Sequence, residues 1–308
     1  MQAEKKTLMN LLGFTVVNHP ELLSTMKKLL STNVGSKNKF NYGETLIALT
    51  RHLINRHPQL LPIIHGEIVM PHDEQLQVQM KGNFSYSSET ENLRKAYEQS
   101  MALNTKVPRW ITLMEGMSGT KYRYLINSLL ESMQEVRYLE VGSWKGSTVC
   151  SAMYGNSGKA ICIDNWSEFG GPKTDFLTNI QKVVTEKTEI EHIEEDFRKV
   201  DWTRLPKSNV YLFDGPHQEI DQIEGITFAL PALEDSFYLI IDDYNFPEVR
   251  KGTQTAISQS GLHVHCALEI RTTQNDKIST FYRSNYSDWH NGYYIAYVSK
   301  NNSEAEKF

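Results

Sequence analysis

Cysteine is scarce in this chain, and the few cysteines present are widely spaced. The 308 residues include only Cys150, Cys162 and Cys266, with no CxxC pair. An odd and scattered set argues against a disulfide framework or a zinc knot, so we expect three buried thiols. Apolar runs of the roughly 18 to 20 residues that a membrane span requires are also missing. The amino terminus lacks the long apolar stretch and the cleavage site of a signal peptide, so we expect a soluble, cytoplasmic protein.

The chain has no surplus of positive charge. Lys and Arg total 32 against 37 Asp and Glu, which gives a formal net charge of -5. This balance offers no electrostatic reason to expect a nucleic acid as partner, and it favours a small-molecule substrate. Hydrophobic residues make up 40% of the chain, enough for a sizeable core.

The sequence pattern changes near Pro108, which breaks a helical stretch that Ser88 and Glu91 open with the spacing of a capping box. Before it, apolar residues recur mainly at helical spacing. The exception is residues 65–87, where residues 75–80 alternate polar and apolar and Gly82 and Asn83 provide a turn, which predicts a small hairpin. We therefore predict a mainly helical auxiliary domain over residues 1–110, which supplies substrate walls or oligomer contacts, a second domain over residues 111–300, and a frayed tail over residues 301–308. The boundary carries a tolerance of about ten residues.

The second domain has the pattern of a doubly wound α/β fold. Helix-like stretches alternate with short, continuously apolar runs at residues 137–141, 160–163, 209–213 and 237–241. Continuous rather than alternating hydrophobicity is what a parallel strand covered on both faces requires. Two further strand-like segments, residues 263–270 and 293–299, have no helix between them and predict an antiparallel hairpin that closes one edge of the sheet.

A glycine loop follows the first of these strands. The strand ends at Glu140, and Gly142, Ser143 and Gly146 lead into the next helix. Gly142 permits a tight turn, and the helix that begins beyond Gly146 presents free N–H groups to a carboxylate or phosphate. Such a loop also suits dinucleotide-binding folds and ordinary strand-to-helix turns. The second strand ends in Asp164, about twenty residues further on, where a carboxylate can accept hydrogen bonds from both hydroxyls of a ribose.

Three carboxylates follow the fourth and fifth strands. Asp214 comes directly after the fourth, and Asp242 and Asp243 come after the fifth. Neighbouring parallel strands end at the same edge of the sheet, so these acids should converge. A bound magnesium, manganese or calcium ion would offset their mutual repulsion. A single Asp at a strand end is usually structural, and an Asp-Asp pair could simply cap a loop.

The ExGxxxG loop with an acid at the end of the second strand resembles the class I S-adenosylmethionine (SAM) dependent methyltransferases. The resemblance extends to metal-dependent O-methyltransferases of the catechol type and of the macrolide-sugar (macrocin) type. It implies a Rossmann-like sheet with an antiparallel last strand. It also assigns the methionine part of SAM to Glu140, Gly142, Ser143 and Gly146, and the ribose to Asp164.

The resemblance covers roughly residues 113–300 and implies three further cofactor contacts. Trp166 and Asp196 stand where related enzymes contact the adenine, and Met117 lies in a segment, residues 114–119, that resembles the cover over SAM in catechol enzymes. Trp166 could instead be a core aromatic, and Asp196 could belong to a solvated acidic run.

The same resemblance assigns a magnesium ion to Asp214, Asp242 and Asp243. The sequence departs from many sugar-directed relatives at Pro216, where they carry a second Asp. His217 then becomes the candidate base, because it stands three residues after Asp214, the offset of the catalytic lysine in catechol enzymes. An imidazole can accept a proton at neutral pH. Capping of the next helix is the structural alternative.

These features predict a SAM-dependent methyltransferase that methylates a hydroxyl of a small natural product or sugar with a divalent cation. The aromatic-rich loop at residues 282–294 could cover the acceptor or form a homo-oligomer contact. Two alternatives remain open: a metal-independent N- or C-methyltransferase, and a catalytically weak SAM-binding or assembly protein.

Overall fold

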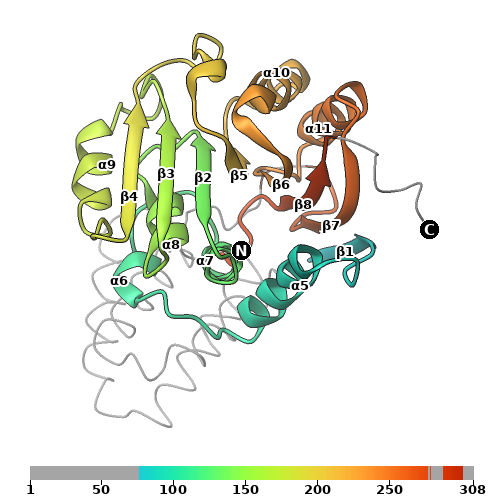
Figure 1. Cartoon of the computed structure of the whole chain (residues 1–308), viewed down its shortest axis with the longest axis horizontal. Helices are drawn as coiled ribbons and strands as arrows, with labels where there is room; N and C mark the ends of the chain where they lie inside the picture. The colour runs from blue at the N-terminus through green and yellow to red at the C-terminus, as the bar shows by residue number, and fades with distance from the viewer. Residues whose placement is uncertain (1–75, 277, 279–286, 301–308) are drawn as a thin grey trace, which may run out of the picture. The chain divides into compact units, whose positions relative to one another are not determined.

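The computed structural model describes residues 76–276, 278 and 287–300 (Figure 1). Tertiary contacts divide the chain into two compact units, Met1–Glu74 and Gln75–Phe308, and all the described residues belong to the second. The auxiliary region before Gln75, the tail and much of the aromatic loop therefore lie outside the described residues. The second unit begins well before the expected boundary near residue 110.

The described residues form one eight-stranded sheet in the order β1-β7-β8-β6-β5-β2-β3-β4. The five strands from β6 to β4 are parallel, and β8 runs antiparallel to both of its neighbours, which confirms the predicted mostly parallel sheet with an antiparallel last strand. The strands are β1 (Gln77–Gly82), β2 (Val136–Val141), β3 (Gly158–Ile163), β4 (Thr188–Ile193), β5 (Ser208–Phe213), β6 (Leu233–Ile241), β7 (His263–Arg271) and β8 (Tyr293–Ser299).

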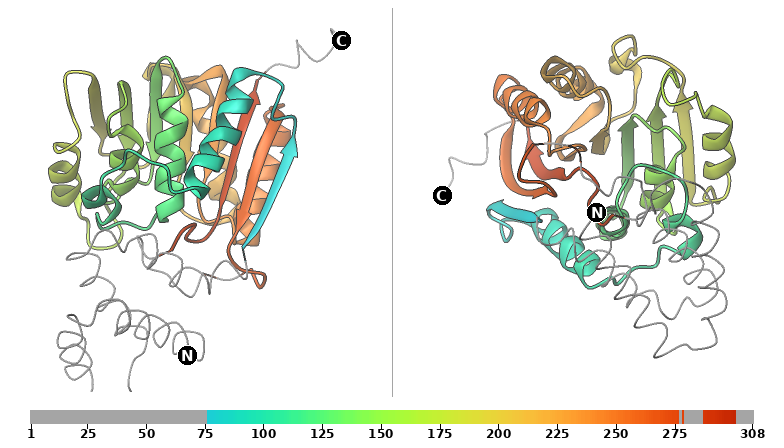
Figure 2. Two further views of the ribbon diagram at one scale, coloured as in Figure 1. Left: turned by 90° about the horizontal axis from the view of Figure 1, so that it is seen from below. Right: turned by 180° about the vertical axis from the view of Figure 1, so that it is seen from behind.

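Helices cover both faces of the sheet (Figure 2). One core cluster joins α5, α7, α8 and α9 to the sheet, and the other joins α10 and α11 to the opposite face. The helices are α5 (Ser88–Met101), α6 (Arg109–Thr112), α7 (Thr120–Glu131), α8 (Ser147–Met153), α9 (Lys173–Ile180), α10 (Glu219–Ala229) and α11 (Pro247–Gln259), with short 3₁₀ turns η3 (Trp202–Arg204) and η4 (Leu230–Ala232).

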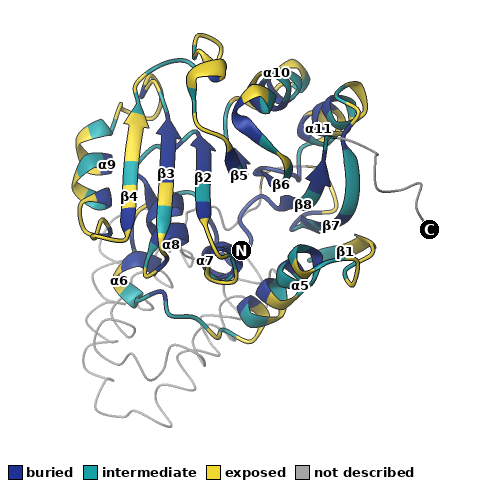
Figure 3. Cartoon of the chain, viewed as in Figure 1, coloured by how far each residue is buried: buried dark blue, intermediate teal, exposed yellow. Residues whose placement is uncertain are grey.

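The hydrophobic run of strand β6 is continuous because both faces of the strand are buried. Tyr238 and Ile240 enter the core under α5 and α7, whereas Phe237, Leu239 and Ile241 enter the core under α10 and α11. Successive side chains of a strand point to opposite faces, so a strand buried on both faces needs an apolar residue at every position. The central strands are accordingly buried along most of their length (Figure 3). The three cysteines are also buried, as expected.

Two local predictions were wrong. The residues expected to form a small hairpin form β1, which pairs with β7 far along the chain and makes the edge of the sheet, so the β7–β8 hairpin does not close it. Helix α5 is capped by Ser87 and Thr90, one residue before the capping box expected at Ser88 and Glu91, because the Thr90 hydroxyl accepts the Ser87 N–H at 2.9 Å. Strand β1 joins the sheet through β7. Helix α5 packs on the sheet, since the Tyr238 hydroxyl of β6 donates to the Glu89 carbonyl of α5.

None of the helices among the described residues is long and apolar enough to cross a membrane.

Candidate functional site

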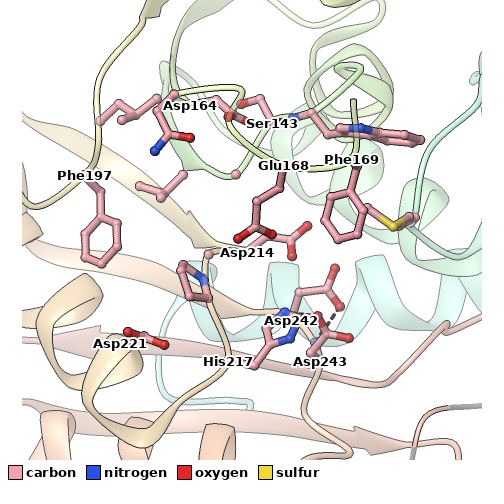
Figure 4. A pocket seen from close by; sticks show the side chains of 18 of the residues that line it. Ser143, Asp164, Glu168, Phe169, Phe197, Asp214, His217, Asp221, Asp242 and Asp243 are labelled. Atoms are coloured by element: carbon pink, nitrogen blue, oxygen red, sulfur yellow. Dashed lines mark hydrogen bonds and ion pairs between the residues drawn. The ribbon is translucent and has the colours of Figure 1, made fainter. Parts of the chain in front are cut away.

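A cleft of about 620 Å³ opens at the carboxyl ends of the parallel strands (Figure 4). The chain runs from β2 to β3 and β4 on one side and returns to β5 and β6 on the other. The order therefore reverses between β2 and β5, and open α/β sheets bind ligands at such a switch point. The cleft has one half after β2 and β3, called the glycine-loop half, and one after β5 and β6, called the acidic half.

Backbone strain is concentrated around this cleft. Seven described residues other than glycine have positive φ angles, and five of them line the cleft: Trp144, Trp166, Phe169, Asp243 and His290. A left-handed conformation is unfavourable for residues with a Cβ atom and persists where the surrounding structure enforces it, often at functional sites.

The two glycines of the loop are required by packing within the chain. Gly142 has a φ of 85°, and an added Cβ would lie 1.8 Å from the Asp214 carbonyl oxygen. Gly146 has a φ of 78°, and its Cβ would lie 2.9 Å from the ring of Phe176. Gly142 and the buried Ser143 line the cleft, whereas Gly146 is not among the lining residues.

Asp164 is held firmly in the glycine-loop half. Its two carboxylate oxygens accept the N–H groups of Trp144 at 2.8 Å and Trp166 at 2.6 Å. The Trp166 indole donates to the Trp144 carbonyl and packs against Phe176, so this side chain is part of the core as well as of the cleft wall. The carboxylate is therefore fixed in orientation, and its remaining lone pairs can accept bonds from a ligand.

The other assigned cofactor residues fall into two groups. Met117 and Asp196 line the cleft, as does the mostly buried Phe197. Glu140 is not among the lining residues, because it is fully buried beneath the loop, where the Tyr138 hydroxyl donates to it at 2.6 Å. Burial raises the pKa of Glu140 to about 7, against the opposing effect of the hydrogen bond from Tyr138.

The acidic half brings the three expected carboxylates together. Asp242 and Asp243 are 5% and 6% exposed. Burial, followed by the charges of its two neighbours, raises the pKa of Asp214 well above its usual range, and burial with the charge of Asp243 does the same for Asp242. Asp243 differs: burial opposes its ionisation, but the hydrogen bond and charge of His217 outweigh burial and lower its pKa.

Asp243 is oriented by three hydrogen bonds. His217 Nε2 lies 2.7 Å from Asp243 Oδ2, Asn291 Nδ2 donates to Oδ1 at 2.6 Å, and the Asp243 N–H donates to Asp242. His217 is 47% exposed at its side chain, and its ring stacks on Phe246. Burial alone would lower the pKa of His217, but the hydrogen bond and charge of Asp243 leave that pKa raised.

Two overlapping groups of side chains could hold a metal ion. Ligand atoms of Asp214, His217 and Asp243 lie within 4.8 Å of one another, and so do those of Asp242, Asp243 and His290. The sequence placed the three acids in one set, whereas each group here combines Asp243 with another acid and a histidine. His290 was missed. Its only sequence signal is its place in the aromatic-rich loop before β8.

Comparisons with known proteins find distant structural similarity only. No family model matches the chain, and no curated protein matches it. Similar solved structures include the O-methyltransferase TomG from Streptomyces achromogenes in complex with SAM (14% identity, 68% of this chain and 90% of that chain, TM-score 0.42). An O-methyltransferase from Bacillus cereus in complex with S-adenosylhomocysteine (SAH) is 14% identical, with 68% of this chain and 91% of that chain covered and a TM-score of 0.42. A putative RNA methyltransferase from Pyrococcus horikoshii is 16% identical, with 66% of this chain and 97% of that chain covered and a TM-score of 0.40. At these values, function has to be argued from this chain's own residues.

Proposed function

We propose that this chain is a SAM-dependent methyltransferase that methylates a hydroxyl of a small molecule with the help of a divalent cation. The observation that carries the proposal is the cleft itself. On one side of the switch point of the sheet, Asp164 has a fixed carboxylate that can accept hydrogen bonds from ribose hydroxyls, and on the other side lie the clustered carboxylates of Asp214, Asp242 and Asp243. The cleft volume of about 620 Å³ suits a small-molecule site.

The residues of the glycine-loop half fit SAM. Asp164 would accept the ribose hydroxyls, and Ser143 and the N–H groups of the loop would bind the methionine part. Phe197 and Ile163 supply apolar wall for an adenine, with Asp196 beside them. When bound, SAM supplies a methyl group already activated by its sulfonium, so the protein's task is alignment and deprotonation.

The residues of the acidic half fit a divalent cation. Burial and the charges of neighbouring carboxylates oppose the ionisation of Asp214 and Asp242, and hard cations prefer such carboxylate oxygens. A cation bound there would lower the pKa of an acceptor hydroxyl. The net charge of -5 and the acidic cleft favour a small acceptor over a nucleic acid.

In the transfer step the acceptor oxygen forms a bond to the methyl carbon as the carbon–sulfur bond breaks. The hydroxyl proton has to leave, and His217 is placed to take it. It lies beside the cluster, half exposed and oriented by Asp243 and Phe246. Asn291 holds Asp243 from the other side, which keeps the geometry of the pair.

Calorimetric titration with S-adenosylhomocysteine (SAH), followed by transfer of labelled methyl from SAM to a panel of catechols and vicinal diols, tests this proposal. We expect SAH to bind and the transfer to stop with chelator. A folded protein that does not bind SAH would overturn the proposal. Transfer to nitrogen or carbon that chelator does not affect would replace it with the metal-independent reading.

A further inference from the structure

His290 is held by its backbone in an unfavourable conformation. Its φ is 42°, in the left-handed region. The His290 N–H donates to the Ser287 hydroxyl at 2.6 Å, and its carbonyl accepts the Thr272 hydroxyl at 2.7 Å. Asn245, which follows the acidic pair, donates in turn to Thr272 at 2.8 Å. The chain therefore fixes this residue on both sides despite the strain.

The ring of His290 is buried and has an unpaired nitrogen. The residue is 7% exposed, and its Nδ1 has no hydrogen-bond partner among the described residues. One of its ring nitrogens lies within 4.8 Å of a carboxylate oxygen of Asp242 and of one of Asp243, and these two oxygens are also within 4.8 Å of each other. Buried polar atoms are rarely left unpaired, so a missing partner at this place points to a ligand.

The sheet explains why these residues meet. Strands β6 and β8 are antiparallel, with Ile241 opposite Tyr294. The pairing continues beyond β6, because the Tyr244 N–H donates to the Gly292 carbonyl and the Asn245 N–H to the Asn291 carbonyl. The chain that leaves β6 therefore runs beside the chain that enters β8, which brings His290 to the two acids.

We propose that His290 binds the divalent cation together with Asp242 and Asp243, so that the ion has a mixed nitrogen and oxygen ligand set. This inference rests on the cation of the proposed function and goes beyond it by naming the ligand and the class of metal. Magnesium prefers oxygen ligands alone, whereas imidazole suits transition-metal ions such as iron, nickel and zinc. The site should therefore prefer a transition-metal ion.

His217 is less suited to this role. It already pairs with Asp243 through Nε2, and nearly half of its side chain is exposed. His290 offers a buried nitrogen that no described residue occupies. The two histidines thus have different roles: His290 binds the ion, and His217 remains the base beside it.

Pulsed electron paramagnetic resonance of the Mn²⁺-loaded protein tests the assignment, because it detects nitrogen bound directly to manganese. We compare the wild type with His290→Asn, which keeps a side chain that tolerates the left-handed backbone, and with His217→Gln as the matched control. The nitrogen coupling should appear in the wild type and in His217→Gln and should vanish in His290→Asn. The Mn²⁺ affinity of His290→Asn should fall roughly tenfold or more, and the wild type should bind Mn²⁺ at least about tenfold more tightly than Mg²⁺.

Failure of the His290 assignment can be distinguished from failure of the cation in the proposed function. Mn²⁺ that binds without nitrogen coupling would overturn the role of His290 and leave the cation of the proposed function standing. Coupling that persists in His290→Asn and disappears in His217→Gln would overturn it in favour of His217. A wild-type protein that binds SAH but no Mn²⁺ would overturn both this inference and the cation. SAH titration of each variant checks that the cleft is intact.

Discussion

The two halves of the cleft satisfy their carboxylates in opposite ways. In the glycine-loop half, the chain itself satisfies Asp164 with two backbone N–H groups. In the acidic half, Asp242 is buried and Asp214 is half-buried, and the pKa values of both are raised well above the usual range. The proposed function accounts for this difference, because it puts an organic cofactor with neutral hydroxyls in the first half and a cation in the second.

Glu140 lies between the halves and is affected by both. It is buried at the end of β2, and its charge raises the pKa values of Asp214 and Asp242, while the charge of Asp164 raises that of Glu140. A change of charge in one half therefore affects pKa values in the other. Variants that alter one half at a time test whether cofactor binding and cation binding belong to separate halves.

Asp242→Asn should give the largest effect, and it should be confined to the acidic half. We expect cation affinity to fall on the order of a hundred- to a thousandfold, because a charged ligand is lost, while SAH affinity changes little. In the presence of chelator the variant should be more stable than the wild type at pH 8, since one buried repulsion is removed. Equal cation affinity in the two proteins would remove Asp242 from the site.

Glu140→Gln should change how stability depends on pH. Burial raises the pKa of Glu140 from 4.5 to about 7, so the folded protein holds this proton more tightly than the unfolded chain does. Its contribution to stability is therefore full below pH 4.5 and is lost as the pH rises to about 7. Between pH 4.5 and pH 8, we expect the free energy of unfolding to fall by about 3 kcal/mol less in Glu140→Gln than in the wild type. Urea unfolding with chelator present measures this, and parallel pH profiles would contradict it.

His217→Ala tests the base. Turnover should fall roughly a hundredfold at pH 7, with part of the activity recovered at higher pH as the acceptor hydroxyl ionises without help. Cation and SAH affinities should change little. Initial rates between pH 6 and pH 9 check this outcome, and wild-type rates across that range would mean that the proton leaves by another route.

Asp164→Ala should give the smallest effect, confined to the glycine-loop half. SAH affinity should fall roughly ten- to a hundredfold through loss of charge-assisted hydrogen bonds, and cation affinity should stay the same. Asp196→Ala is the comparison within the same half, because Asp196 also lines the cleft but its carboxylate accepts one backbone N–H among the described residues, that of Arg198, whereas the Asp164 carboxylate accepts two. A larger loss in Asp196→Ala than in Asp164→Ala would reverse the assignment.

The parts of the fold that follow from local pattern could be predicted from the sequence. Four of the five parallel strands, β2, β3, β5 and β6, contain apolar runs, and Asp164, Asp214 and Asp242 directly follow strands, so their positions could be inferred without coordinates. Strand β4 at the edge alternates polar and apolar residues and has no such run. The pairing of β1 with β7 could not, because no local pattern specifies a partner so distant in the chain. Nor could the role of His290, which depends on a strained backbone and on the pairing of β6 with β8.

Gly142 has a role in the fold that the sequence did not indicate. It was expected to permit a tight turn, and in the structure an added Cβ would also collide with the Asp214 carbonyl. The glycine joins the ends of β2 and β5, and the cleft opens beside this contact. A substitution there would disturb folding as well as binding, so it cannot serve as a clean test of the cofactor site.

The claim that the acidic half is incomplete without a cation is tested most directly by proton release. Manganese is titrated calorimetrically into chelator-treated protein at pH 7 in two buffers that differ in ionisation enthalpy. Because Asp214 and Asp242 resist ionisation in the cation-free cleft, binding should release about one proton per ion. Asp242→Asn should bind weakly and release fewer protons. Tight binding without proton release, or no binding by a wild-type protein that binds SAH, would contradict the account.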